Sequence, residues 1–247
     1  MYLVGFSLIC LIGVTLAIPT ADKRIVGGFP AEYGEAPWMV SMRSSLNVHL
    51  CGGTLLNQNF VLTTAVCMEG RLATNTMAVV GSRFLNTQAA AYYGTQTITH
   101  PQYNQNTLEF NVALFRTFFN VIFTDIVQPI QLNANFTSAG TRGRMYGWGA
   151  TESGDGNSNA LQTINLNVID NDVCRDSLGS DGMRVTASTM CTLTREGQGL
   201  CTNDAGGALV VDFSVIGVAS WKIPCATGRP DVFVRASAIR DWVVSII

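Results

Sequence analysis

Charged side chains are scarce in this sequence. Asp, Glu, Lys and Arg make up only 13% of its 247 residues, and the formal net charge is −2. A nucleic-acid-binding surface would show clustered Lys and Arg, and this balance argues against one. The same balance gives no broad attraction to anionic membranes or polyanions. We therefore expect no nucleic-acid partner and no membrane-surface partner.

Zinc-binding cysteine patterns are also missing. None of the seven cysteines has a C-x-x-C or similar ligand spacing, so a metal site built on cysteine is disfavoured. Cys10 lies in the apolar N-terminal segment, and six cysteines remain beyond it. An even number in a secreted chain predicts three disulfides, and counting alone leaves about fifteen possible pairings.

The N-terminal segment carries no charged side chain up to Ala17. An apolar run of this length, followed by Ile18 and Pro19, is typical of a signal peptide that spans residues 1–17. An uncleaved anchor is the alternative, but a membrane-spanning helix needs about 20 apolar residues. We expect a secreted, extracellular protein, with residues 18–24 as a short propeptide.

Short apolar or alternating runs follow, separated by clusters of Gly, Asn, Ser and Pro. Many short strands at such spacing predict an all-β barrel or sandwich. The polar stretch Glu152–Asn159 reads as a surface loop, and Ile239, Trp242, Val243 and Ile246 repeat at helical spacing near the C-terminus. The expected strands are Trp38–Arg43, Phe60–Thr63, Arg142–Trp148, Leu161–Val168, Ala208–Val211 and Val215–Trp221.

Several motifs then occur in a fixed order. The first, Ile25-Val-Gly-Gly28, directly follows Arg24. In this order and spacing the motifs resemble the trypsin/chymotrypsin family from Ile25 to Ile247, and chymotrypsin-like peptidases of arthropods in particular. The others are Cys51-Gly-Gly-Thr-Leu-Leu56, Val61-Leu-Thr-Thr-Ala-Val-Cys67, Asn111-Val-Ala-Leu-Phe115, Gly147-Trp-Gly149, Cys201-Thr-Asn-Asp-Ala-Gly-Gly-Ala208, Ser220-Trp-Lys222 and Pro230-Asp-Val-Phe233.

The resemblance implies one peptidase-like domain over residues 25–247. Its fold would be two six-stranded antiparallel β-barrels, with lobes of approximately 25–130 and 131–235 and a C-terminal helix over 236–247. It also implies the disulfides Cys51–Cys67, Cys174–Cys191 and Cys201–Cys225. We expect a monomer with no cofactor.

Some family members bind calcium through carboxylates in a loop of the first barrel. Between Cys67 and Phe110 the only acidic residues here are Glu69 and Glu109, so we expect no metal.

The family's catalytic triad is replaced at all three positions. Val66 stands where the family has its His, Asn111 where it has its Asp, and Ala205 where it has its nucleophilic Ser. Losing the nucleophile or the base alone costs on the order of 10⁶ in turnover in this mechanistic class. The only histidines, His49 and His100, match structural positions of the family. The sequence therefore predicts the loss of triad catalysis.

The oxyanion hole of the family uses backbone N–H groups, and here it would be formed at Asn203 and Ala205. Asn203 replaces a Gly, but Asn tolerates left-handed backbone angles better than most residues. Arg24–Ile25 remains a trypsin-type activation site, and the family pairs the new N-terminus with Asp204. Cleavage there as a functional switch is one hypothesis; inheritance from an active ancestor is the other.

The specificity pocket is expected at Gly199, Ser220, Lys222 and Asp231. Gly199 would lie at its floor and Asp231 on its wall. We expect Lys222 to fold inward and pair with Asp231, which would plug the pocket; the alternative is that Lys222 extends into solvent. Asn111 is expected to be buried and bonded to Ser220.

Two features remain. Val66 and Ala205 should leave an apolar hollow where the family's imidazole lies. Asn135-Phe-Thr137 is an N-glycosylation sequon.

The sequence thus favours a non-catalytic binding or regulatory protein: a cofactor, decoy or modulator of proteolysis. Its partner would be a peptidase, a peptidase inhibitor or a substrate-like protein. The alternative function is a serine-type endopeptidase-like hydrolase with residual activity. A hydroxyl at Thr202 lies next to the site, but nothing nearby in the sequence would activate it.

Overall fold

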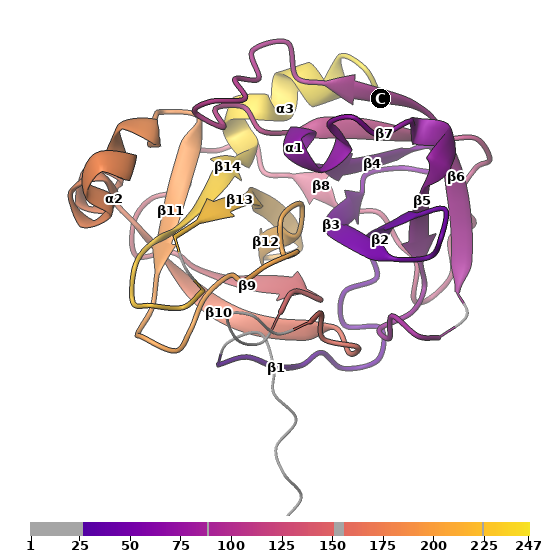
Figure 1. Ribbon diagram of the computed structural model, residues 1–247, viewed down its shortest axis with the longest axis horizontal. Helices are drawn as coiled ribbons and strands as arrows, with labels where there is room; N and C mark the ends of the chain where they lie inside the picture. Colours follow the sequence, from indigo (N-terminus) through magenta and orange to yellow (C-terminus); the bar gives the residue numbers. More distant parts are fainter. Residues whose placement is uncertain (1–26, 88, 151–155, 224) are drawn as a thin grey trace, which may run out of the picture.

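A computed structural model describes residues 27–247, apart from residues 88, 151–155 and 224. Two β-barrels lie side by side, with helix α3 packed across one end of both (Figure 1). The expected signal peptide, propeptide and activation site at Arg24 and Ile25 lie outside the described residues. The predicted fold of two closed six-stranded antiparallel barrels with a C-terminal helix is confirmed.

The first barrel closes in the strand order β2-β3-β4-β7-β6-β5. Its interior is lined by buried apolar side chains, among them Val40, Leu55, Val61 and Phe115. A short helix, α1 (Ala65–Met68), follows β4. The strands are β2 (Met39–Ser44), β3 (His49–Leu55), β4 (Phe60–Thr63), β5 (Thr76–Val80), β6 (Ala90–Thr99) and β7 (Ala113–Thr117), and a 3₁₀ turn covers Ala73–Asn75.

The second barrel follows the order β10-β11-β14-β13-β12-β9 and closes where β10 pairs with β9. Two short strands join this sheet: β1 (Phe29–Pro30) pairs with β10, and β8 (Gln131–Leu132) runs parallel to β13. The barrel strands are β9 (Arg142–Gly147), β10 (Gln162–Ile169), β11 (Thr189–Leu193), β12 (Ala208–Val211), β13 (Ser214–Lys222) and β14 (Asp231–Arg235).

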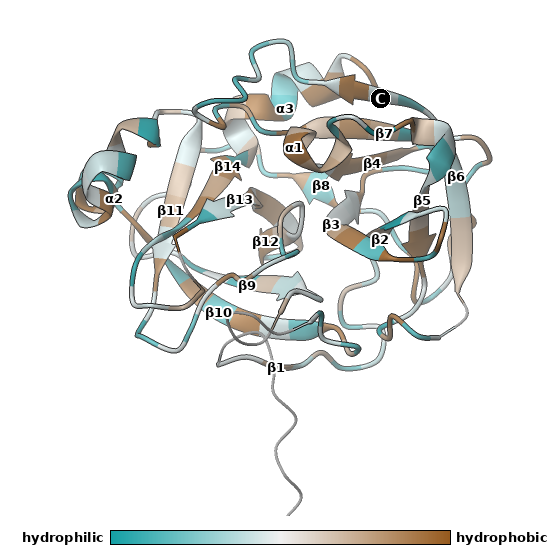
Figure 2. Cartoon of the chain, in the orientation of Figure 1, coloured by the Kyte–Doolittle hydropathy of each residue, from teal (hydrophilic) through white to brown (hydrophobic). Residues whose placement is uncertain are grey.

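Helices occupy the margins of the second barrel. Helix α2 (Asn171–Leu178) continues into a 3₁₀ turn, Gly179–Arg184, and presents mostly polar residues, whereas the barrel strands carry most of the hydrophobic colour (Figure 2). Helix α3 (Ala236–Val244) buries Ala236, Ile239 and Val243. No helix in the described part of the chain is long and apolar enough to cross a membrane.

The expected strands match the observed ones closely. Phe60–Thr63 and Ala208–Val211 are strands over those same residues, and each of the other four differs from the prediction by one residue at one or both ends. The predicted C-terminal helix was too long, because α3 ends at Val244. Beyond it, the amides of Ser245, Ile246 and Ile247 bond back to carbonyls of the last turn.

All three disulfides that the resemblance implied are present: Cys51–Cys67, Cys174–Cys191 and Cys201–Cys225. Cys51–Cys67 joins β3 to α1, and Cys174–Cys191 fixes α2 to β11. Cys201–Cys225 joins the loop that precedes β12 to the segment that follows β13.

Candidate functional site

A cavity of about 270 Å³ marks the candidate site. It lies at the face where the second barrel meets the first, between the loop that precedes β12 and the end of β13. The expected site residues Asn203, Ala205, Ser220 and Lys222 line it, together with Leu200, Cys201, Thr202 and Trp221.

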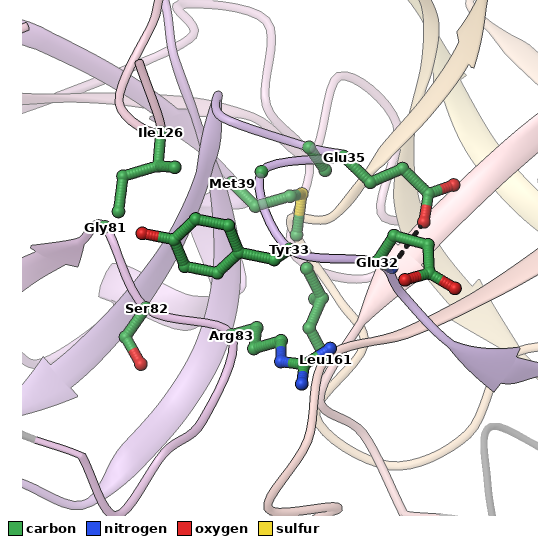
Figure 3. A pocket seen from close by; sticks show the side chains of 11 residues that line it. Glu32, Tyr33, Glu35, Met39, Gly81, Ser82, Arg83, Ile126 and Leu161 are labelled. Carbon is green, nitrogen blue, oxygen red and sulfur yellow. Dashed lines mark hydrogen bonds between the residues drawn. The ribbon is translucent and has the colours of Figure 1, made fainter. Parts of the chain in front are cut away.

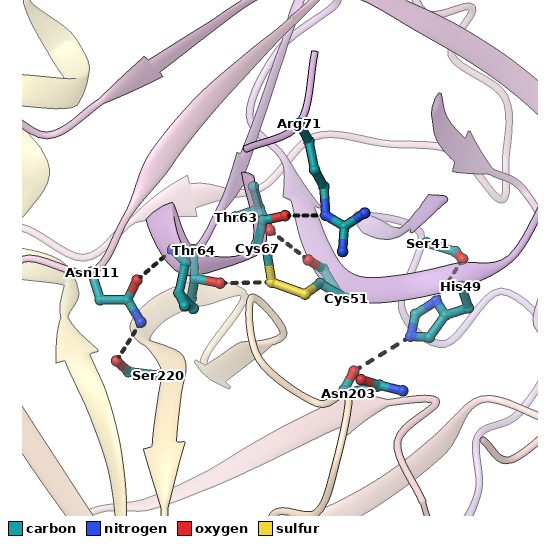
Figure 4. The surroundings of a disulfide bond; sticks show 12 residues. Ser41, His49, Cys51, Thr63, Thr64, Cys67, Arg71, Asn111, Asn203 and Ser220 are labelled. Atoms are coloured by element: carbon teal, nitrogen blue, oxygen red, sulfur yellow. Dashed lines mark hydrogen bonds between the residues drawn. A yellow bond between two sulfur atoms is a disulfide. The ribbon is translucent and has the colours of Figure 1, made fainter. Parts of the chain in front are cut away.

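Asn111 connects three elements at this site. It lies just before β7, is fully buried, and accepts a hydrogen bond from the Val66 amide of α1 at 3.0 Å. Its side-chain NH₂ donates to the Ser220 hydroxyl on β13, also at 3.0 Å (Figure 4). The predicted burial of Asn111 and its bond to Ser220 are therefore confirmed. The two bonds satisfy buried polar groups that would otherwise be costly.

Val66 and Ala205 place only hydrocarbon at the other two triad-equivalent positions. The Val66 side chain is 40% exposed, whereas Ala205 is half-buried and packs against the core of the first barrel. Ala205 lines the cavity but Val66 does not. The hollow expected between these two side chains is therefore not the cavity itself.

The loop 201–205 turns its carbonyl groups into the protein. The carbonyl of Thr202 accepts from the Ala150 amide at 2.8 Å, and that of Ala205 accepts from the Gly52 amide at 2.8 Å. Asn203 adopts the left-handed conformation expected of it, with φ 69°. Within the described residues, the backbone amides of Asn203 and Ala205 have no hydrogen-bond acceptor.

His49 supports this loop from the first barrel. Its Nε2 lies 3.4 Å from the Asn203 carbonyl, so Nε2 carries the proton, and Nδ1 accepts from the Ser41 hydroxyl at 2.8 Å (Figure 4). Burial lowers the pKa of His49 to about 4, with the Asn203 carbonyl opposing that shift. His49 is therefore neutral at physiological pH, and both ring nitrogens are engaged.

The second histidine, His100, is also buried. Its ring stacks on Phe110 with a centroid distance of 4.5 Å and meets Trp242 edge-on. Burial lowers its pKa below the ordinary value. Both histidines thus occupy structural positions, as predicted.

Asp204 is a buried residue of this loop. Its carboxylate accepts from the amides of Gly149 at 2.9 Å and Cys201 at 2.8 Å. Burial raises its pKa to about 6, and the two amides oppose this shift. A Cβ at Gly147 or Gly149 would collide with the carboxylate, so these glycines let the chain approach it. Pairing of Asp204 with a new Ile25 N-terminus stays a prediction, because Ile25 is not described.

The Lys222–Asp231 ion pair that we expected is not formed. The two residues are cross-strand neighbours on β13 and β14, but Asp231 instead accepts from the Leu200 amide at 2.8 Å. Burial is the main cause that raises the pKa of Asp231 to about 7; the Leu200 amide and the charge of Lys222 oppose this shift, and the charge of Asp204 adds to it. Gly199 packs against this carboxylate. One oxygen of Asp231 thus bonds the backbone, and half-buried Lys222 lines the cavity.

One hydrogen bond at the site could not be predicted from the sequence. The Asn203 side chain donates to the Asn157 side chain at 2.8 Å. Asn157 belongs to the stretch Glu152–Asn159 expected as a surface loop, of which residues 152–155 are not described. Composition predicted that loop, but no local pattern predicts which of its residues reaches the cleft.

Other features offer weaker candidates. The hollow between Tyr33 and Arg83 holds only about 30 Å³, room for a water molecule (Figure 3). Among the described residues, no three His, Cys, Asp or Glu side chains are grouped to hold a metal ion. Within the sequon, Asn135 is exposed between β8 and β9, whereas Thr137 is buried.

Comparisons with known proteins agree with this architecture. The model of the trypsin family matches residues 25–243. Chymotrypsin-2 of Vespa crabro is 34% identical over 220 residues, which cover 89% of this chain and 98% of that protein. Trypsin of Phaedon cochleariae is 31% identical, with 98% of each chain covered. Trypsin, alkaline C, of Manduca sexta is 32% identical, with 92% of each covered.

Proposed function

Because the chain belongs to the trypsin family, we propose that it is a peptidase homologue that binds a protein ligand in its cleft without cleaving it. The observation that supports this proposal most directly is that Ala205 stands at the position of the family's nucleophilic Ser. Acyl transfer in this family requires a nucleophilic oxygen at that position and a base that takes its proton. The methyl group of Ala205 has no lone pair, and Val66 has no proton acceptor.

No other residue of the described cleft replaces these groups. His49 is neutral and bonded through both ring nitrogens, and His100 is buried against Phe110 and Trp242. Thr202 is exposed and lines the cavity, but the described residues place no base beside its hydroxyl. A nucleophile without a base is a weak one at neutral pH, which disfavours residual hydrolysis as the alternative function.

The framework of the cleft supports binding. Three disulfides, the Asn111 bonds and the His49 contact hold the surfaces of both barrels in place. A rigid preformed surface loses less conformational entropy when a ligand binds. We infer a secreted cofactor, decoy or modulator of proteolysis, whose partner is a peptidase, an inhibitor or a substrate-like protein.

Covalent labelling tests this function. The purified chain, cleaved after Arg24 in a controlled step, is treated with a fluorophosphonate probe, which reacts with activated serine hydroxyls. We expect no labelling. A triple revertant carrying Val66→His, Asn111→Asp and Ala205→Ser serves as the matched control for a folded cleft.

Labelling of the native chain would overturn the proposal. Thr202→Ala would then show whether the reactive hydroxyl is the one that lines the cavity, because loss of label in that variant identifies Thr202 as the nucleophile.

A further inference from the structure

Residues that carry unused hydrogen-bond donors line the cavity of the cleft. The carbonyl groups of Thr202, Asn203 and Ala205 are all engaged with groups of the protein. The amides of Asn203 and Ala205 have no acceptor in the described part of the chain. Because these three carbonyl groups already accept hydrogen bonds while the two amides donate none within the described residues, the loop favours a ligand that brings acceptor oxygens.

A third donor comes from β13. The Ser220 oxygen accepts from Asn111 at 3.0 Å, so its hydroxyl hydrogen is left to donate. Ser220 and both loop residues line the same cavity. The ligand oxygens would therefore meet donors from two separate elements.

Lys222 adds a positive charge to this group of donors. It is half-buried, lines the cavity and belongs to no ion pair among the described residues. The acids that sense its charge, Asp204 and Asp231, are 1% and 6% exposed and do not line the cavity. Burial raises the pKa of these carboxyl groups to about 6 and about 7, which reduces their negative charge in mildly acidic solution. An anionic ligand would thus meet an ammonium with no competing acid on the cavity wall.

We propose that this cavity binds a carboxylate of a peptide, held by the Lys222 ammonium and the backbone amides of Asn203 and Ala205. This inference rests on the non-catalytic function proposed above. A free peptide C-terminus and an acidic side chain share this chemistry. The cavity volume of about 270 Å³ suits one end of a peptide rather than a larger ligand. Ala205 contributes a methyl group and no hydroxyl, so the carboxylate stays unmodified.

The test compares three peptides of one sequence. The first ends in Leu with a free carboxylate, the second ends in Leu-amide, and the third is an amide with Glu in place of Leu. Isothermal titration calorimetry with the purified chain gives the affinities, and mass spectrometry of each sample shows whether the peptide stays intact. We expect one of the two carboxylate peptides to bind at least tenfold more tightly than Leu-amide.

Variants locate the binding site. Lys222→Gln removes the positive charge but keeps a side chain of similar length. It should weaken binding of the preferred carboxylate peptide about 10- to 100-fold and leave binding of the Leu-amide peptide unchanged. Lys222→Arg should retain most of the affinity. Arg240→Gln is the matched control, because it removes the same charge from α3 at a residue that does not line this cavity. Bound peptide should also slow acetylation of Lys222, measured by mass spectrometry at that residue.

The outcomes separate the two proposals. Equal affinity for all three peptides, no binding of any, or unchanged binding by Lys222→Gln would overturn the carboxylate site and leave the non-catalytic function standing. A peptide cut during the titration would instead overturn the non-catalytic function. Preference for the first peptide identifies a C-terminus as the ligand, and preference for the third identifies an acidic side chain.

Discussion

At the scale of single residues, burial changes the protonation of the Asp231 carboxyl group. Its carboxylate is 6% exposed and has one backbone donor, the Leu200 amide at 2.8 Å. Burial disfavours the charged form, and its pKa rises from 3.8 to about 7. The residue is therefore largely protonated in mildly acidic solution and increasingly charged above neutral pH.

This raised pKa makes the free energy of unfolding depend on pH. A carboxyl group whose folded pKa is raised contributes stability that is complete below its unfolded pKa and is lost as pH rises through its folded pKa. Between pH 4 and pH 8 the native chain should lose stability relative to Asp231→Asn by on the order of 2–4 kcal/mol. Chemical denaturation of both proteins across this range, with disulfides intact, measures the difference.

Asp212→Asn is the control for this prediction, because Asp212 is exposed and its neutralisation leaves the buried group untouched. Stability curves for the native chain and Asp231→Asn that stay parallel from pH 4 to pH 8 would contradict the assignment.

Residue-scale prediction from sequence succeeded where one side chain decides the outcome. Asn111 aligned with a buried family position and is buried, and Asn203 tolerates the left-handed backbone as expected. The ion pair of Lys222 with Asp231 was wrong: the Asp231 carboxylate is buried and bonds the Leu200 amide, whereas Lys222 is half-buried and lines the cavity. The sequence shows the charges of two residues, but not a backbone amide that competes for one of them.

At the scale of elements, Asn111 joins α1, the start of β7 and β13. It accepts from the Val66 amide and donates to the Ser220 hydroxyl, both at 3.0 Å. The three elements lie far apart in sequence, and these bonds hold one edge of the cleft together.

Asn111→Ala should lower the free energy of unfolding by about 1–3 kcal/mol, because it leaves buried polar groups without partners. Chemical denaturation measures the loss. Asn120→Ala is the matched control: Asn120 is exposed, and its change should stay within about 0.5 kcal/mol. Equal stability of Asn111→Ala and the native chain would refute the connecting role.

Element boundaries were predictable where local pattern governs them. Phe60–Thr63 and Ala208–Val211 form strands because compact apolar runs are bounded by turn residues. The end of α3 at Val244 was missed, since the apolar spacing continues to Ile246 while the backbone turns. The two-residue pairing of β1 with β10 joins Phe29 to Thr163, and no local pattern encodes a contact of that range.

At the scale of the whole molecule, the two barrels contact each other through backbone atoms at glycine residues. The Gly52 amide of β3 donates to the Ala205 carbonyl at 2.8 Å, and a Cβ on Gly52 would collide with the backbone at Gly207. His49 and Asn111 add further contacts between the barrels beside the cleft. The architecture of a peptidase is thus present around the positions Val66, Asn111 and Ala205.

Turnover of peptide substrates tests the central claim most directly. The native chain and the triple revertant, both cleaved after Arg24, are compared on chymotrypsin, trypsin and elastase substrates at matched concentration. We expect no cleavage by the native chain above a buffer blank, because the described residues bring no nucleophile and base together in the cleft. Sustained cleavage that survives removal of trace peptidases from the native sample would contradict it.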